Sequence, residues 1–148
     1  IRTLIAQGEM ERAMEFLGHP HILTDRVGHG KRLGSSLGFP TVNLHFPEGV
    51  LVPSHGVYVT RVRFQDGTSR PAVTNIGVRP TVDDGDRVNV EGYILDFSGD
   101  LYEQMVRVEF YKKLRDERKF PSLEALREEI MKNARETWDY FQNSQSAP

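Results

Sequence analysis

Two short oxygen-bearing side chains, Thr41 and Asn43, follow a rigid proline in the stretch LGSSLGFPTVNLHFP, residues 33–47. Pro40 fixes its own backbone angle and favours an extended conformation in the residue before it. If the extension continues, Thr41 and Asn43 face the same way while Val42 points into the core. A hydroxyl and an amide carbonyl are hard oxygen ligands of the kind that Mg²⁺ prefers. A turn with ordinary side-chain hydrogen bonds fits the same residues, and on spacing alone it is the better interpretation.

Glu91 is an ionisable residue on a strand face that is otherwise largely apolar. The alternation within residues 88–97 places Asn89, Glu91, Tyr93, Leu95 and Phe97 on one side. A buried carboxylate is unfavourable without a partner. Facing a metal and phosphates, Glu91 could accept the proton of an attacking alcohol during phosphoryl transfer. An exposed glutamate at the rim of the sheet fits the pattern about equally well.

Two loop segments carry further candidate residues. Residues 28–34, GHGKRLG, combine glycine with positive charge, which suits close approach of the backbone to phosphate oxygens. Their spacing matches neither a P-loop nor a dinucleotide fingerprint, so a plain flexible loop is the stronger interpretation of this segment alone. Residues 114–120, LRDERKF, are a charged run of the kind that usually forms a solvated connector. Alternatively, Phe120 contacts an aromatic ligand while Arg115 or Arg118 pairs with an anionic group.

Strands are the main elements expected to position these residues. The alternation predicts strands over 57–64, 70–76, 88–97 and 105–111, with turns at 66–67 and 83–86. In the last of these strands, Val106, Val108 and Phe110 are the expected buried set. Short strands joined mostly by tight turns favour an antiparallel barrel or sandwich over a parallel sheet.

Helices are expected only at the two ends of the chain. Residues 1–17 have helical spacing that is interrupted at Gly8 and ended by the Gly-His-Pro sequence that follows. Ser122 can cap a helix that runs to about Gln142 and lies against the barrel. Its apolar face is expected to carry Leu123, Leu126, Ile130, Ala134, Trp138 and Phe141.

The bulk composition narrows the classes of protein. A chain of 148 residues is the size of one domain, and its net charge of -2 gives no overall attraction to nucleic acid or to an anionic membrane. No apolar run approaches the roughly 20 residues that cross a bilayer, so we expect a cytoplasmic protein. With no cysteine, the chain can form no disulfide, thiolate zinc site or iron–sulfur cluster. The five histidines have no metal-binding spacing.

Taken together and in order, the segments resemble the riboflavin kinase family, specifically the C-terminal kinase module of bacterial bifunctional FAD synthetases. The resemblance covers about residues 18–141 and rests on HGKRLGSSLGFPTVNL, LVPSHGVYV, AVTNIGVRPT, VEGYILDF, DLYEQ and LRDERKFPSLEAL. It implies a mainly β fold, a six-stranded antiparallel Greek-key barrel with a long C-terminal helix. The short N-terminal helical segment, residues 1–17, resembles the last helices of a preceding adenylyltransferase module.

The resemblance also implies roles for individual residues. Thr41 and Asn43 match the PTAN motif, whose threonine and asparagine hold Mg²⁺, or another hard divalent ion, and ATP phosphates. Glu91 matches the catalytic base, expected to face that ion across the barrel opening. Nucleotide contacts are assigned to Gly30, Lys31, Ser35, Thr41, Asn43 and Tyr102, and flavin contacts to Arg115, Arg118 and Phe120. The chain departs from the family pattern at Ser35, Val42, Gly92, Tyr93 and Glu103.

The implied function is transfer of the ATP γ-phosphate to the 5′-hydroxyl of riboflavin, giving FMN and ADP. Residues 18–142 would form the kinase and residues 143–148 a disordered tail. In the full-length protein, a linked N-terminal FMN adenylyltransferase module is the expected partner, and without it this chain should be unable to make FAD. Two alternatives stay open, a flavin or nucleotide binding module without turnover and a barrel that binds single-stranded nucleic acid. The net charge of -2 disfavours the nucleic-acid alternative.

Overall fold

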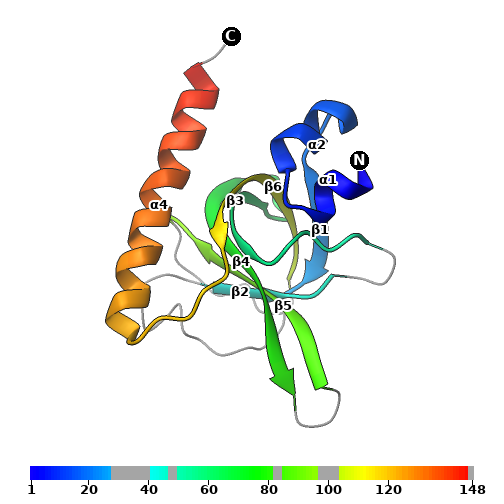
Figure 1. The fold of residues 1–148 in the computed structure, drawn as a ribbon. Coiled ribbons are helices and arrows are strands. Elements are labelled where there is room, and N and C mark those ends of the chain that lie inside the picture. The colour runs from blue at the N-terminus through cyan, green and yellow to red at the C-terminus, as the bar shows by residue number, and fades with distance from the viewer. Residues whose placement is uncertain (28–40, 47–49, 82–84, 97–103, 147–148) are drawn as a thin grey trace.

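The computed structural model describes the backbone of residues 1–27, 41–46, 50–81, 85–96 and 104–146 (Figure 1). Side chains are described for the same residues except 78–81, 85–87 and 144–146. Its helices are α1 (Arg2–Ala6), α2 (Met10–Leu17) and α4 (Leu123–Ser146). Its strands are β1 (His21–Arg26), β2 (Thr41–Leu44), β3 (Gly56–Arg63), β4 (Ser69–Thr81), β5 (Gly85–Ile94) and β6 (Met105–Asp116).

The strands form one sheet in the order β1-β6-β3-β4-β5-β2, and every neighbouring pair is antiparallel. Strands β3, β4 and β5 pair in sequence and β6 returns to the free side of β3, which is the Greek-key order. The sheet curls into a half-barrel (Figure 1). Its edge strands β1 and β2 are linked where the backbone N–H of His45 donates to Asp25 Oδ2 at 2.8 Å. The predicted mainly β, six-stranded antiparallel architecture with a C-terminal helix is confirmed.

The inner face of the sheet carries the larger hydrophobic core. Alternation along the strands places one set of side chains inside, where they are almost fully buried. Helices α1 and α2 contribute Ile5, Met10 and Ala13 to the same core. The strand members of this core are Leu23, Val42, Leu44, Tyr58, Val62, Ala72, Ile76, Val90, Ile94, Val106, Val108 and Phe110. Val42 and the predicted buried set of β6 are therefore confirmed.

The outer face of the sheet is covered by α4, which lies on the opposite side of the molecule from α1 and α2 (Figure 1). Its smaller core combines apolar side chains of β3, β4 and β5 with Ile130 and Ala134 of the helix. The predicted cap is present, since Ser122 Oγ accepts a hydrogen bond from the Ala125 N–H at 3.1 Å. Residues 1–17 also follow the prediction, with two helical pieces broken around Gly8, whose φ is 81°.

The packed stripe of α4 differs from the predicted one. Leu123 and Trp138 are 57% and 38% exposed, whereas Asn133 and Thr137 are buried. The buried positions Ile130, Asn133, Ala134, Thr137 and Phe141 still have helical spacing, but two of them are polar. The prediction of the contact face from apolar residues alone was therefore wrong at its borders, where polar residues are buried instead.

Two strands are longer than predicted. Strand β4 extends to Thr81 and β6 to Asp116, because the backbone hydrogen bonds between strands continue where the side chains become polar. The backbone of α4 continues to Ser146 rather than ending near Gln142, so part of the expected disordered tail is helical. Adding a residue to an existing helix is much easier than starting one, even where the helix propensity is modest.

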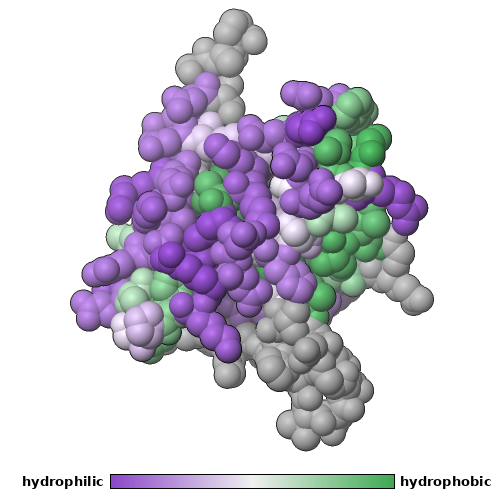
Figure 2. All heavy atoms as spheres, viewed as in Figure 1, coloured by the Kyte–Doolittle hydropathy of each residue, from purple (hydrophilic) through white to green (hydrophobic). Residues whose placement is uncertain are grey.

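Apolar and polar surfaces are unevenly distributed. Figure 2 shows hydrophilic side chains over much of the viewed face and apolar residues gathered around α1 and α2. Ile1 and Phe16, at the ends of this helical segment, are 52% and 65% exposed. Among the described residues, no helix has the length and apolarity to span a membrane.

Candidate active site

Asn43 and Glu91 occupy directly opposite positions on the paired strands β2 and β5. Opposite residues of an antiparallel pair project from the same face, with β-carbons about 5 Å apart. Because Val42 and Val90 belong to the inner core, Asn43 and Glu91 project from the outer face. The two residues thus share one wall, side by side, rather than facing each other across the barrel opening as we expected.

The amide of Asn43 has a buried oxygen that no hydrogen bond from the described residues satisfies. Its side chain is 6% exposed, and within the described part of the chain Oδ1 accepts no hydrogen bond. Leaving such an atom without a partner is unfavourable, by about 1–3 kcal/mol. Thr41, half-buried, lies two residues earlier on the same face. An orphaned amide oxygen beside a hydroxyl fits a hard divalent ion, which would complete its shell with waters and phosphate oxygens.

The carboxylate of Glu91 is buried rather than exposed at a rim. Glu91 is 5% exposed. Asn89 Nδ2 donates to its Oε1 at 3.1 Å, and the Tyr93 hydroxyl donates to its Oε2 at 3.3 Å. These donors fix the orientation of the carboxylate. The alternative of an exposed rim glutamate is therefore wrong.

A cavity of about 230 Å³ joins Glu91 to the predicted flavin-binding residues. Arg115, Arg118 and Phe120 all line it, although they are more than twenty positions away in the sequence. The lining combines polar and apolar side chains, as in many small-molecule sites. Its remaining residues are Val57, Val73, Asn75, Gly77, Asn89, Tyr93, Glu117, Leu126 and Ile130.

One row of paired positions runs across the outer face through this cavity. It consists of Arg115 on β6, Val57 on β3, Asn75 on β4, Glu91 on β5 and Asn43 on β2. We call it the cross-strand row. Neighbouring strands are about 4.8 Å apart, so the row orders these side chains along a single line. The register between β3 and β6 shifts between Val57 and Tyr58, and this shift places Arg115 opposite Val57.

Arg115 and Arg118 share one carboxylate from helix α4. Glu129 Oε1 lies 3.3 Å from Arg115 Nε, and Glu129 Oε2 lies 3.3 Å from Arg118 Nη2. Asn133 Oδ1 accepts a further hydrogen bond from Arg115 Nε at 3.3 Å. Burial lowers the pKa of Arg115, and Glu129 opposes this effect. The guanidinium stays charged at neutral pH because the ordinary pKa of arginine is far higher.

The same two arginines lie over the ring of Phe120. Arg115 Cζ is 5.3 Å and Arg118 Cζ is 4.8 Å from the ring centroid, both within the range of cation–π attraction. Arg115 belongs to the end of β6, not to the connector in which we placed it. Phe120 follows that strand and precedes α4. This cluster of two guanidiniums and an aromatic ring forms the end of the cavity away from Asn43.

Sequence reasoning missed three polar contributors to this site. Glu129 was assigned no role because its partners come from β6 and the following segment, a tertiary relationship that periodicity does not report. Asn75 was missed because its position opposite Glu91 depends on strand register. Glu117 was missed as a cavity residue; a β-carbon at Gly77 would lie 2.8 Å from its carboxylate oxygens. The TNIG segment of the sequence, residues 74–77, was the available signal for Asn75 and Gly77.

Four predicted nucleotide-side residues lie outside the described residues. They are Gly30, Lys31, Ser35 and Tyr102. Their roles remain predictions. Within the described ranges, no group of three or more His, Asp or Glu side chains could hold a metal ion. Thr41 and Asn43 remain the predicted ligands of a divalent ion.

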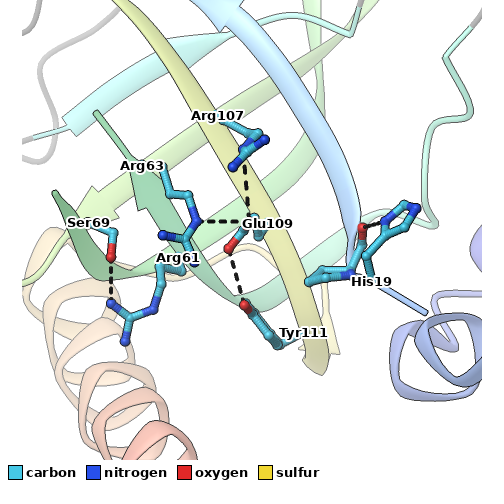
Figure 3. A network of polar contacts seen from close by, with 8 residues as sticks. His19, Arg61, Arg63, Ser69, Arg107, Glu109 and Tyr111 are labelled. Carbon is cyan, nitrogen blue, oxygen red and sulfur yellow. Dashed lines mark hydrogen bonds and ion pairs between the residues drawn. The ribbon is translucent and has the colours of Figure 1, made fainter. Parts of the chain in front are cut away.

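A second buried glutamate, Glu109, lies on the outer face away from the cavity (Figure 3). Arg63 Nε is 2.9 Å and Arg107 Nε is 3.9 Å from its Oε2, while the Tyr111 hydroxyl donates to Oε1 at 3.1 Å. Burial and the neighbouring Glu109 charge raise the pKa of Tyr111. Glu109 is thus held in a network of ion pairs and a hydrogen bond.

An antiparallel half-barrel with hard oxygen donors beside a buried, oriented carboxylate suits a β-fold enzyme of the phosphoryl-transfer type. Comparison with known families identifies which one. The riboflavin kinase model, Flavokinase, matches residues 17–141, and the chain belongs to this family.

Curated relatives agree with the family match. Bifunctional riboflavin kinase/FMN adenylyltransferases are 43% identical over 130 residues in Pseudomonas fluorescens and 41% identical over 144 residues in Haemophilus influenzae. These alignments cover 88% and 97% of this chain but 41% and 46% of the relatives. The chain therefore spans less than half the length of these relatives.

Two solved structures share the fold. Riboflavin kinase from Trypanosoma brucei superposes with a TM-score of 0.62 at 28% identity, covering 86% of this chain and 83% of that one. A Streptococcus pneumoniae structure described as a macrolide-efflux protein gives a TM-score of 0.84 at 31% identity, covering 92% of this chain and 44% of that one.

Proposed function

We propose that this chain transfers the γ-phosphoryl group of ATP to the 5′-hydroxyl of riboflavin, giving FMN and ADP. The observation that carries the proposal is the pairing of Asn43 with Glu91 beside a cavity whose far end holds Arg115 and Phe120. Asn43 would then lie on the side of the ATP phosphates, Glu91 at the reacting hydroxyl, and Phe120 at the flavin ring. Membership of the riboflavin kinase family supports the same reaction.

Glu91 is proposed as the general base. The terminal hydroxyl of the ribityl chain lies against its carboxylate, which takes the proton as the oxygen attacks phosphorus. A new bond forms between the riboflavin oxygen and the γ-phosphorus. The bond between the γ-phosphorus and the oxygen that bridges the β- and γ-phosphates breaks, and ADP leaves. The hydrogen bonds from Asn89 and Tyr93 hold the carboxylate in one orientation before the substrate arrives. Preorganisation of this kind reduces the cost of reaching the transition state.

Thr41 and Asn43 are proposed to hold the metal–nucleotide side. A divalent ion bound there would neutralise charge on the transferring phosphoryl group. The orphaned Oδ1 of Asn43 and the Thr41 hydroxyl supply neutral oxygens, which leaves the ion's positive charge available for phosphate. Gly30, Lys31, Ser35 and Tyr102 are proposed as further contacts on the nucleotide side. Mg²⁺ is the ion that this donor set suits best.

The isoalloxazine ring is proposed to occupy the end of the cavity near Phe120. Val57, Leu126 and Ile130 offer apolar contact there, and Phe120 offers an aromatic face. Arg115 and Arg118 can donate hydrogen bonds to the carbonyl oxygens of the ring's pyrimidine portion. This orientation points the ribityl chain along the cross-strand row toward Glu91.

The test is direct product analysis. The purified chain is incubated with riboflavin, ATP and Mg²⁺, and the flavins are separated and identified by mass spectrometry. We expect FMN and one equivalent of ADP, and no FAD. Riboflavin binding without FMN formation would instead support a flavin-binding module without turnover. In the full-length protein, a linked FMN adenylyltransferase module, as named in the relatives, is proposed to consume the FMN.

A further inference from the structure

Asn75 occupies the middle of the cross-strand row, between an apolar residue and the proposed base. It pairs with Val57 on one side and with Glu91 on the other. It is half-buried and lines the cavity. Within the described part of the chain, its carboxamide makes no hydrogen bond. A polar group that faces a binding cavity with its hydrogen-bonding capacity unused is prepared for a ligand.

We infer that Asn75 recognises the secondary hydroxyl groups of the ribityl chain and so selects flavins that carry a polyol. This role rests on the proposed function, because it takes its orientation from the hydroxyl that reacts at Glu91. Nothing in the proposed chemistry requires Asn75. Its contribution would lie in distinguishing riboflavin from flavins that carry a plain alkyl alcohol.

The position of Asn75 agrees with the length of the substrate. Adjacent strands lie about 4.8 Å apart. A carbon–carbon bond spans about 1.5 Å, so one strand spacing corresponds to roughly three or four carbon atoms of an extended chain. With the terminal hydroxyl at Glu91, the carbons opposite Asn75 are therefore those that carry secondary hydroxyls. The ring begins further along, over Val57.

The chemistry of the side chain also matches. A carboxamide offers two donor hydrogens and an acceptor oxygen, and each hydroxyl can both donate and accept. The neighbouring Val57 can make neither interaction, which leaves Asn75 as the polar group at this step of the row. A substrate without secondary hydroxyls would leave the buried part of the amide without a partner, and this is the usual basis for strong discrimination.

A substrate-variant cycle tests this role. The value of kcat/KM is measured for riboflavin and for a flavin whose N10 side chain is 5-hydroxypentyl, which has the reacting hydroxyl and no others. For Asn75→Ala we expect a loss of about tenfold with riboflavin and little change with the hydroxypentyl flavin. The preference for riboflavin over the hydroxypentyl flavin should therefore be smaller in the variant than in the unchanged protein, by the same factor. Equal losses with both flavins would overturn the inference, because they would mean that Asn75 only shapes the cavity or orients Glu91.

Val73→Ala is the matched control, since Val73 lies two residues earlier on β4, on the same face, and lines the same cavity. We expect Val73→Ala to lower kcat/KM for both flavins by similar factors. If Asn75→Ala does not fold, Asn75→Ser provides the same ratio. Equilibrium binding, followed by quenching of flavin fluorescence without ATP, separates this inference from the proposed function. A chain without turnover would still bind riboflavin more tightly through Asn75, whereas a lack of selectivity between the two flavins would contradict the inference even if FMN forms.

Discussion

Asn43 and Glu91 lie directly opposite each other on the antiparallel strands β2 and β5, with both side chains nearly inaccessible to solvent. This pairing places an amide oxygen without a described hydrogen-bond partner beside an oriented carboxylate. Strand register, rather than a mobile loop, determines their separation. The proposed metal-side donor and the proposed base are therefore preorganised by the same backbone hydrogen bonds that hold the sheet together.

Glu91→Gln should remove turnover while leaving binding of both substrates. The glutamine can still accept hydrogen bonds but cannot take the proton from the ribityl hydroxyl. We expect FMN formation to fall by roughly 100- to 10,000-fold, the usual contribution of a general base. Product formation is followed by chromatography, and riboflavin binding by fluorescence quenching. Near-normal turnover would remove Glu91 from the proposed role.

Glu109→Gln is the control for this change, because Glu109 is also a buried strand glutamate on the outer face. Removing its charge weakens the ion pairs with Arg63 and Arg107, so a lower melting temperature is expected. The folded protein should keep its kcat. A loss of kcat in both variants would show that any buried charge on this face matters, not Glu91 in particular.

Asn43→Ala should weaken the metal–nucleotide side and spare the flavin side. The alanine removes the amide oxygen, so we expect the KM for Mg·ATP to rise roughly tenfold or more, with riboflavin binding unchanged. A readout independent of turnover is the increase in melting temperature produced by Mg·ADP, which should shrink in the variant. An unchanged shift would mean that the ion does not depend on Asn43. Asn143→Ala, at an exposed position of α4, provides the control.

Glu129→Gln should loosen the arginine end of the cavity. The change removes the charge that faces both Arg115 and Arg118, and Arg118 is 58% exposed, so the effect on each pair is moderate. We expect the KM for riboflavin to rise about fivefold with little change in kcat or in the KM for Mg·ATP. Glu128→Gln, on the exposed side of the same helix turn, is the matched control. A change in kcat alone would contradict a role on the flavin side.

His21 should make the fold less stable in mild acid. Burial lowers the pKa of His21, which packs against Phe46 and Phe110 and donates from Nε2 to the Leu51 carbonyl at 2.9 Å. The unfolded chain binds a proton at this residue below about pH 6.5, whereas the folded chain binds it only at a lower pH. The free energy of unfolding should therefore decrease as pH falls from about 6.5 toward the folded pKa.

The measurement is urea unfolding at several pH values between about 5 and 7.5, a range that spans the ordinary histidine pKa. In His21→Gln the dependence on pH should be weaker over this range. His55→Gln, at an exposed position, should retain it. Parallel curves for His21→Gln and the unchanged protein would assign the dependence to other groups.

Much of the fold could be predicted because period-two alternation reports which side of a strand is buried. The inner positions Val106, Val108 and Phe110 follow directly from it, as does the inward direction of Val42 between Thr41 and Asn43. The turn after β3 follows from Asp66 and Gly67, because Gly67 adopts a φ of 89°. These features depend on neighbours within a few residues.

The parts of the site that could not be predicted depend on pairing between distant segments. Arg115 reaches the cavity through shifts of register between β3 and β6, which no local pattern encodes. Asn133 and Thr137 are buried because α4 packs on a partly polar surface, so an apolar stripe misidentified the contact face. The neighbourhood of Glu91, Asn75 and Glu129 likewise depends on which strands and helix meet.

Because side chains alternate between the two faces of β5, the position of each residue along the strand determines which face it serves. Val90 and Ile94 support the interior while Glu91 and Tyr93 serve the cavity. Inserting or deleting one residue within this strand would exchange the two sets beyond that point, placing a carboxylate in the hydrophobic core and a valine at the cavity. Either face can therefore be altered by substitution, whereas a change of one residue in the strand's length would have to be absorbed by a bulge such as those between β3 and β6.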